Sequence, residues 1–220
     1  FCIALYRAIS QGRNYLFRTA ASFVRVLAGM TRKNYLENYK QGARGIIIVG
    51  SHTDKTTKQI KKASELDMVV PILFEVNGKE GTELSKESTK LSELCSELMK
   101  QNKIPLVYTS RQVVKSAAKE QALERSVQIS DAVQRIVANL QIKPDFVIAK
   151  GGITSSDIAT KALDIKKAIV IGQAAPGIPV WRLNYKARFS NILYIIFPGN
   201  VGEEETLKQI IENICKGGGS

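Results

Sequence analysis

Two adjacent glycines followed by a cluster of hydroxyl side chains form the clearest chemical feature of the sequence. Gly151 and Gly152 follow the apolar run 146–149, and three hydroxyl-bearing residues come shortly after them: Thr154, Ser155 and Ser156. This order is typical of a strand, a tight turn and the start of a helix. The first N–H groups of a helix have no partner within it, and the helix dipole is positive there. The turn is therefore predicted to bind an anion, most often phosphate.

Two charged residues flank this turn, and each admits more than one role. Lys150 precedes the glycines and is placed to neutralise phosphate charge. Asp157 is placed to bind magnesium, directly or through water, or to serve as an acidic residue in the first turn of the helix. The second role is favoured for Asp157. The sequence has neither a Walker A loop nor a G-x-G-x-x-G fingerprint at this place, so the turn alone does not identify its ligand.

Two more turns are expected beside the first. Ser51 follows the β-branched run 45–49, and the glycine-rich turn 198–202 follows the apolar run 193–197. In an open parallel sheet, ligands bind outside the carboxyl ends of the strands, so the three turns are expected at one edge. His52, the only histidine, is a candidate acid or base, although a turn residue contacting solvent or backbone is the favoured interpretation. The glutamates 203–205 are predicted in the first turn of the last helix, which suits the nucleoside end of a ligand better than its phosphates.

The elements that position these turns follow an α/β pattern. Strands are predicted at 45–50, 69–74, 104–109, 146–149, 168–172 and 193–197, with helices at 55–66, 85–102, 120–140 and 203–215. This alternation predicts an α/β fold, with a mostly parallel sheet, helices on both faces and three αβα layers. Pro71 favours an edge position for strand 69–74. The segment 173–180 contains two prolines and is predicted as a rigid loop outside the sheet, with Trp181 either packing on a base or buried in the core.

Composition limits the class of protein. The 220 residues, 44% of them apolar, can form one large domain or two small ones. No apolar run approaches the roughly 20 residues of a membrane span, and no signal peptide is visible. The cysteines are few and far apart, which argues against disulfides or zinc and favours a reducing, cytoplasmic compartment: Cys2, Cys95 and Cys215. The start at Phe1 suggests a piece of a longer protein, with a linker or tail at 216–220.

The formal net charge of +12 raises the hypothesis of a nucleic-acid binder. The basic residues are scattered over predicted helices, however, and acidic residues are mixed among several of them. Solvated helix faces are therefore the favoured interpretation, and neither nucleic acid nor a membrane is expected as a partner. A positive field would still favour ligands that carry phosphate or carboxylate groups.

Three stretches of the sequence resemble the C-terminal nucleotide-binding domain of the four-carbon acid sugar kinases. They are 150–157 (KGGITSSD), 176–181 (PGIPVW) and 197–202 (FPGNVG). The stretches 18–23 (RTAASF) and 50–57 (GSHTDKTT) are similar to earlier motifs of that family. The resemblance covers nearly the whole chain in family order, so it implies one nucleotide-binding domain over 1–215, with a helical lead-in at 1–40.

The resemblance implies ATP and Mg²⁺ as cofactors and a four-carbon acid sugar, such as threonate, erythronate or a 3-oxo form, as substrate. The family pattern assigns ATP binding to six residues: Ser51, Gly151, Gly152, Ile153, Thr154 and Gly199. Many relatives have Lys-Ser-Gly where this chain has Phe197-Pro198-Gly199, and an acidic residue at the position of Ile153. Both departures resemble the version found in larger fusion enzymes.

The family's N-terminal acid-sugar domain, with its Asp-Asp motif, has no counterpart in this sequence. Phosphoryl transfer needs both partners to be positioned, so the expectation is ATP binding with poor kinase activity by this chain alone and no identified catalytic base. An alternative is a non-catalytic, nucleotide-responsive module of a multidomain metabolic enzyme. A homo-oligomer remains open.

Overall fold

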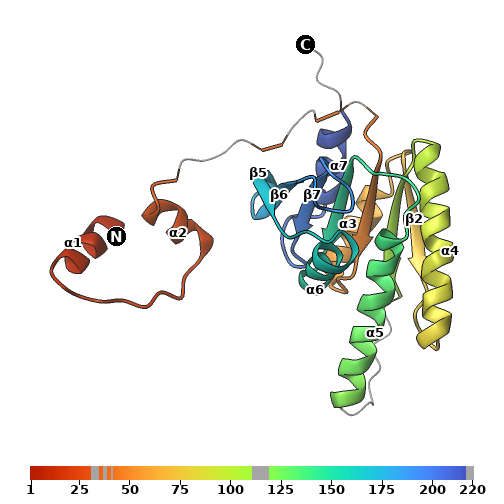
Figure 1. Cartoon of the computed structure of the whole chain (residues 1–220). Helices are drawn as coiled ribbons and strands as arrows, with labels where there is room; N and C mark the ends of the chain where they lie inside the picture. Colours follow the sequence, from red (N-terminus) through yellow and green to blue (C-terminus); the bar gives the residue numbers. More distant parts are fainter. Residues whose placement is uncertain (31–34, 37–38, 41, 111–118, 217–220) are drawn as a thin grey trace. The chain divides into compact units, whose positions relative to one another are not determined.

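The computed structural model describes residues 1–30, 35–36, 39–40, 42–110 and 119–216 (Figure 1). The predicted tail therefore lies outside the described residues from 217 onward. The chain divides into two compact units, Phe1–Asn34 and Tyr35–Ser220. The first unit contains α1 (Cys2–Ser10) and α2 (Ala21–Leu27). Within it, the Phe23 ring lies 5.8 Å from that of Phe1 and 5.4 Å from that of Phe17.

The described part of the second unit forms one seven-stranded sheet, in the order β2-β3-β1-β4-β7-β6-β5. Its strands are β1 (Gly45–Val49), β2 (Val69–Phe74), β3 (Ile104–Thr109), β4 (Phe146–Lys150), β5 (Ala168–Ala175), β6 (Ile178–Leu183) and β7 (Leu193–Phe197). The five strands from β2 to β7 in this order are parallel, and β6 and β5 continue the sheet antiparallel. The predicted α/β fold with a mostly parallel sheet is confirmed, and so is the edge position of β2.

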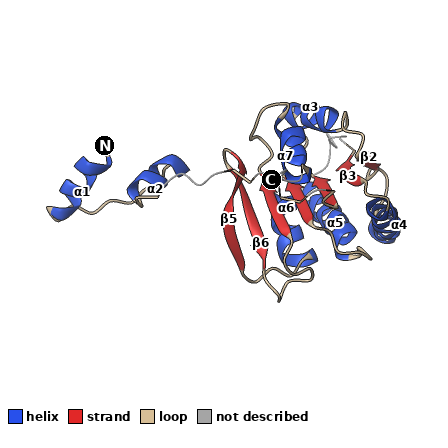
Figure 2. Ribbon diagram, turned by 90° about the horizontal axis from the view of Figure 1, so that it is seen from above, coloured by secondary structure: helices blue, strands red, loops and turns tan. Residues whose placement is uncertain are grey.

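Helices cover both faces of this sheet, as the three-layer prediction requires (Figure 2). One face carries α3 (Asp54–Ala63) and α7 (Thr206–Cys215), and the other carries α4 (Gly81–Lys100), α5 (Lys119–Ala138), α6 (Gly152–Asp157) and the π-helix η1 (Ile158–Ala162). The apolar runs are continuous because both faces of the central strands are buried, as strand β1 shows. Ile46 and Ile48 belong to the core on the α4–α5 side, whereas Ile47 and Val49 belong to the core on the α3–α7 side. No described helix has the length and apolar character needed to cross a membrane.

The segment 173–180 differs from its prediction as a loop outside the sheet. Strand β5 extends through Ala175, the turn takes only Pro176 and Gly177, and β6 returns antiparallel. A proline inside β6 is tolerated because the ladder between β6 and β7 begins only at Val180, one residue after Pro179. Two irregularities in the β5–β6 pairing, one of them between Gln173 and Ala175, further relax the register.

The glutamates 203–205 also differ from their prediction, because they precede α7 rather than form its first turn. The backbone N–H of Glu203 donates to Thr206 Oγ1 at 2.7 Å, which fixes a separate turn before the helix starts at Thr206. Two of the three carboxylates pair with lysines of α3. Glu204 lies 2.6 Å from Lys58 Nζ, and Glu205 lies 3.2 Å from Lys62 Nζ. These pairs lie at the solvent-exposed contact between α3 and the segment leading into α7.

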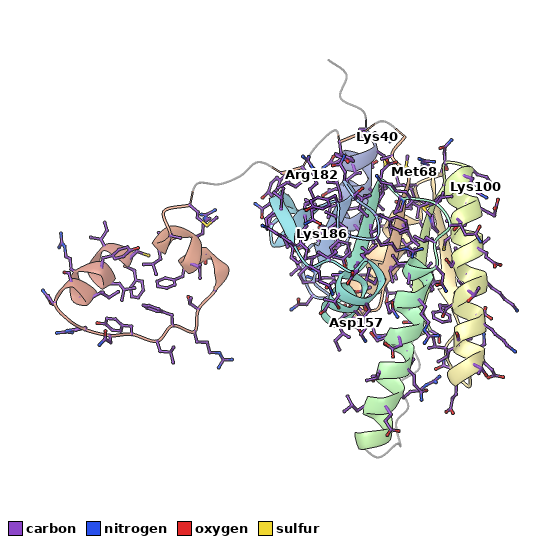
Figure 3. All side chains as sticks on the ribbon, in the orientation of Figure 1. Lys40, Met68, Lys100, Asp157, Arg182 and Lys186 are labelled. Carbon is purple, nitrogen blue, oxygen red and sulfur yellow. The ribbon has the colours of Figure 1, made fainter. Side chains whose placement is uncertain are left out.

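The two ends of the sheet have different surroundings (Figure 3). Lys40, Met68 and Lys100 lie at the end where the strands begin, and Lys40 Nζ pairs there with Asp145 at 2.8 Å, one residue before β4. Asp157, at the end of α6, lies toward the opposite end of the sheet. The turns predicted to form the site, which follow β1, β4 and β7, are at that opposite end.

Candidate functional site

Three turns meet at the carboxyl edge of the sheet because their strands are neighbours. Strand β4 pairs in parallel with β1 on one side and with β7 on the other. The backbone hydrogen bonds continue one residue beyond the strands, from Gly50 N to Lys150 O at 3.0 Å and from Gly151 N to Phe197 O at 2.9 Å. The structure therefore brings Ser51, the 151–154 turn and Gly199 together, as the parallel topology predicts.

A buried hydroxyl links two of these turns. Thr56 in α3 is inaccessible to solvent, and its Oγ1 lies 2.9 Å from Ser51 Oγ and 3.3 Å from the carbonyl oxygen of Gly199. Thr53 caps the same helix, since its Oγ1 accepts a hydrogen bond from Thr56 N at 3.2 Å. Thr56 was not predicted as a site residue. It could have been found from its position three residues after the hydroxyl-bearing cap residue Thr53, which places it in the first turn of the helix, beside the site.

The glycines bring the turns closer than side chains would allow. A Cβ on Gly50 would lie 1.9 Å from Thr154 Oγ1, which is far inside van der Waals contact. Gly151 has a φ of +122°, a conformation that residues with a Cβ rarely adopt, and Ser51 N would lie 3.4 Å from its added Cβ. The close contact of the turns after β1 and β4 therefore depends on glycine at both positions.

The start of α6 presents free space and unused backbone donors. Gly151 is the N-cap residue, and no described side chain caps this terminus with a hydrogen bond. Gly152 is exposed, and a Cβ added to it would meet no atom within 4 Å. Ile153 is also exposed, with 71% of its surface accessible, whereas Thr154 is half-buried against Gly50. Because α6 continues directly into η1, its dipole adds to the positive potential at this turn.

Lys150 lies beneath the turn instead of facing a ligand. Its side chain is inaccessible to solvent, and its Nζ donates to the carbonyl oxygens of Pro198 and Gly199, each at 3.3 Å. The Nζ also lies 3.8 Å from the centroid of the Phe197 ring. Burial, and secondly the positive charge of Lys55, lower the pKa of Lys150 from 10.5 to about 8. Lys150 therefore joins the β4 turn to the β7 turn, and neutralisation of phosphate charge from behind the turn stays a prediction.

Asp157 is engaged elsewhere and is the last residue of α6, so its prediction as a first-turn acid is wrong. Its Oδ2 accepts a hydrogen bond from Ser130 Oγ of α5 at 2.5 Å and lies 3.4 Å from Lys161 Nζ. Among the described residues, no group of three His, Cys, Asp or Glu side chains could hold a metal ion.

His52 lies at the same edge and contacts the neighbouring strand end. Its Nε2 is 3.0 Å from Thr109 Oγ1, the last residue of β3. This contact places the imidazole between the ends of β1 and β3, on the opposite side of β1 from the 151–154 turn. His52 is exposed, which fits the favoured prediction of a turn residue contacting solvent or backbone, although the partner shown here is a side-chain hydroxyl.

Taken together, the fold and the site define a class: an α/β domain with an uncapped helix N-terminus and two close-packed turns at the carboxyl edge of its sheet. The chain matches the family model of the nucleotide-binding C-terminal domain over residues 46–207. It belongs to that family, which confirms the resemblance found in the sequence motifs. Residues 46–207 include all six residues that the resemblance assigns to ATP binding.

Solved structures share this fold at low sequence identity. A putative tRNA synthase from Salmonella typhimurium LT2 is 18% identical with a TM-score of 0.59, over 79% of this chain and 41% of its own. A Haemophilus influenzae protein from a family of unknown function is 20% identical with a TM-score of 0.59, over 86% of this chain and 44% of its own. A domain of unknown function from Bordetella bronchiseptica, described as a domain-swapped dimer with bound citrate, is 13% identical with a TM-score of 0.55, over 80% and 42%.

This chain thus spans less than half the length of each of these solved structures. No curated protein gives a significant match.

Proposed function

We propose that this chain is the ATP-binding half of a kinase that phosphorylates four-carbon acid sugars. One observation supports the nucleotide part: the start of α6 is exposed and uncapped, and Gly50 and Gly151 let the turn after β1 pack closely beside it. The N–H groups of the first helical turn point outward there, and Gly152 leaves room for phosphate oxygens to approach the backbone. Family membership supports nucleotide binding by this domain.

The six predicted residues have different roles in this proposal. Gly151, Gly152, Ile153 and Thr154 supply backbone N–H groups and one hydroxyl to the phosphates. Ser51 and Gly199 form the adjacent wall, held in place by Thr56. The fixed positive charge of Lys150, behind the turns, favours an anionic ligand without touching it.

Mg²⁺ belongs to this proposal as part of the nucleotide, coordinated by phosphate oxygens and water. No protein ligand to the metal is assigned, and no catalytic base is named.

The acid sugar is proposed to bind to residues outside this chain, on the part of the solved structures that the chain does not cover. Phosphoryl transfer depends on positioning of both reactants, so the chain alone should turn over slowly even with ATP bound.

The proposal is tested by measuring threonate and erythronate phosphorylation with the chain alone and with the chain joined to an acid-sugar-binding domain of a relative. Activity only in the joined protein supports the proposal. Ordinary kinase rates from the chain alone contradict the proposal that the acid sugar binds outside this chain. Nucleotide binding without kinase activity in the joined protein favours a nucleotide-responsive module instead.

A further inference from the structure

A groove of about 460 Å³ lies beside α6 and η1, over the antiparallel end of the sheet. This volume falls within the roughly 300–1,000 Å³ typical of small-molecule sites. One wall comes from the helical segment, with Ser156 and Thr160 exposed toward solvent. The floor comes from Val170 in β5, Trp181 in β6 and Ile196 in β7. The groove therefore has hydroxyl groups on one side and a flat apolar surface below.

The groove is continuous with the phosphate turn through one face of the helix. Gly152, Ser156 and Thr160 follow one another at four-residue steps, so they lie on the same side of the helical segment. Ser156 and Thr160 line the groove, and Gly152 lies one turn before it, with open space at its Cβ position. A ligand held at Gly152 can thus extend along this helix face into the groove.

The aromatic floor is held in place by the sheet and by α6. Val170 is directly opposite Trp181 in the β5–β6 ladder, and Trp181 is directly opposite Tyr194 in the β6–β7 ladder. The Trp181 and Tyr194 ring centroids are 6.1 Å apart. The buried Tyr194 hydroxyl donates to the carbonyl oxygen of Ser155 at 2.6 Å, which ties this aromatic pair to the helix wall. The indole is therefore fixed relative to the turn that starts the helix.

The far end of the groove is basic but partly neutralised. Lys166 and Lys167 line it, and Lys166 Nζ lies 2.7 Å from the carboxylate of Asp164. A phosphate group bound at this end would be held best by lysines whose charge is not neutralised by a carboxylate. Lysine ammonium groups beside a carboxylate are better suited to donate hydrogen bonds to the neutral acceptor atoms of a heterocyclic base.

We propose that this groove binds the base and ribose of the nucleotide whose phosphates lie at Gly152. The base packs on Trp181 and Val170, and the ribose hydroxyls face Ser156 and Thr160. This inference rests on the proposed nucleotide-binding function and assigns the part of the site that binds the nucleoside. Aromatic stacking supplies affinity for any base, and the lysines at the far end supply donors to its edge.

Intrinsic fluorescence tests this directly, because Trp181 is the only tryptophan in the chain. The chain is titrated with Mg-ATP, with adenosine and with inorganic tripolyphosphate. Adenosine and Mg-ATP should both change the tryptophan emission. Tripolyphosphate should compete with ATP in calorimetry while leaving the emission unchanged, because it occupies only the turn at Gly152.

A matched pair of variants tests the groove by a second route. Thr160→Phe places a ring in the groove, two turns from Gly152. Thr89→Phe places the same ring on α4, away from the groove. Both threonines are exposed, and each donates a hydrogen bond to the carbonyl four residues earlier, at 2.9 Å for Thr160 and 3.2 Å for Thr89. Thr160→Phe should weaken Mg-ATP binding about tenfold or more, the range expected when a base loses its stacking contact, and Thr89→Phe should not change it.

The outcomes separate this inference from the proposed function on which it rests. Suppose that Mg-ATP binds and that Gly152→Asp abolishes this binding. If Mg-ATP then leaves the emission unchanged, or if Thr160→Phe does not weaken its binding, the groove is not the nucleoside site, but the phosphate site stands. Failure of both Mg-ATP and tripolyphosphate to bind overturns the proposed function and the groove with it. Emission changes with adenosine, together with the selective loss in Thr160→Phe, support both.

Discussion

Gly199 and Ser51 approach so closely that a Cβ on Gly199 would lie 2.8 Å from Ser51 Oγ. The two residues follow β7 and β1, which are separated in the sheet by β4. Their contact bridges the turn after the central strand, and Thr56 Oγ1 bonds to both sides of it. Glycine at position 199 is therefore a requirement of packing between these two turns.

Gly199→Ala should destabilise the domain by about 1–3 kcal/mol, the usual range for overpacking a well-packed site. Urea unfolding of the variant measures this loss. In a Ser51→Ala background the same substitution should cost less, because the oxygen that the new Cβ meets has been removed. Equal costs in both backgrounds would show that the Ser51 contact is not the cause.

Gly152→Ala should weaken nucleotide binding without lowering stability, unlike Gly199→Ala. No atom lies within 4 Å of the added Cβ, and alanine favours helix, so stability should be unchanged or slightly higher. The Cβ would occupy the space in which phosphate approaches the backbone, so Mg-ATP affinity should fall at least about tenfold. Calorimetric titration and urea unfolding of the same protein sample distinguish the two effects. Unchanged affinity would place the phosphates away from this turn.

Lys150 should make both stability and nucleotide binding depend on pH above neutrality. Its pKa in the folded domain is about 8 instead of 10.5, so between these values the folded state binds fewer protons than the unfolded state. The Lys150 contribution to the free energy of unfolding therefore rises with pH across this window, by about 3 kcal/mol in total. Nucleotide affinity should change in the opposite direction, because the positive charge behind the turn is lost above pH 8.

Lys150→Met provides the control, since it keeps a long, unbranched side chain and removes the titrating group. The difference in the free energy of unfolding between parent and variant should shift in favour of the parent as pH rises from 8 to 10.5. Mg-ATP affinity of the variant should lose its dependence on pH near 8. Parallel pH profiles for the two proteins would show that Lys150 does not titrate in this window.

Tyr194→Phe should loosen α6 without altering the turn itself. The substitution removes the buried hydrogen bond from the Tyr194 hydroxyl to Ser155 O, at 2.6 Å, and leaves the ring in place. A loss of about 1–2 kcal/mol in the free energy of unfolding is expected. Faster amide hydrogen exchange should be confined to α6 and η1, and a uniform increase across the sheet would contradict a local role.

The sheet could be predicted from the sequence because its strands are apolar runs with clear boundaries. The run 46–49 lies between Gly45 and Gly50, and strand 146–150 ends at the Gly-Gly turn. Parallel pairing puts the carboxyl ends of the strands at one edge of the sheet, so the common edge of the three turns could be predicted from the sequence. That β4 lies between β1 and β7 is known only from the structure.

The remaining features depend on tertiary contacts that sequence patterns do not encode. Two prolines and a glycine in 173–180 favoured a loop, yet Pro179 lies in β6 at a place where no β7 pairing is lost. Lys150 was predicted to neutralise phosphate charge, but its burial could not be predicted, because the carbonyls of Pro198 and Gly199 that accept its hydrogen bonds lie inside the domain. Both partners come from the turn after β7, about fifty residues away in the chain.

The most direct test of the nucleotide site is a calorimetric titration of the chain with Mg-ATP, beside Gly152→Asp. The aspartate introduces a side chain and a negative charge where the phosphates are proposed to lie, in space that is open in the structure. Binding by the parent and its loss in Gly152→Asp is the predicted result. Equal affinity in both proteins, or no binding by the parent, would contradict a phosphate site at the start of α6.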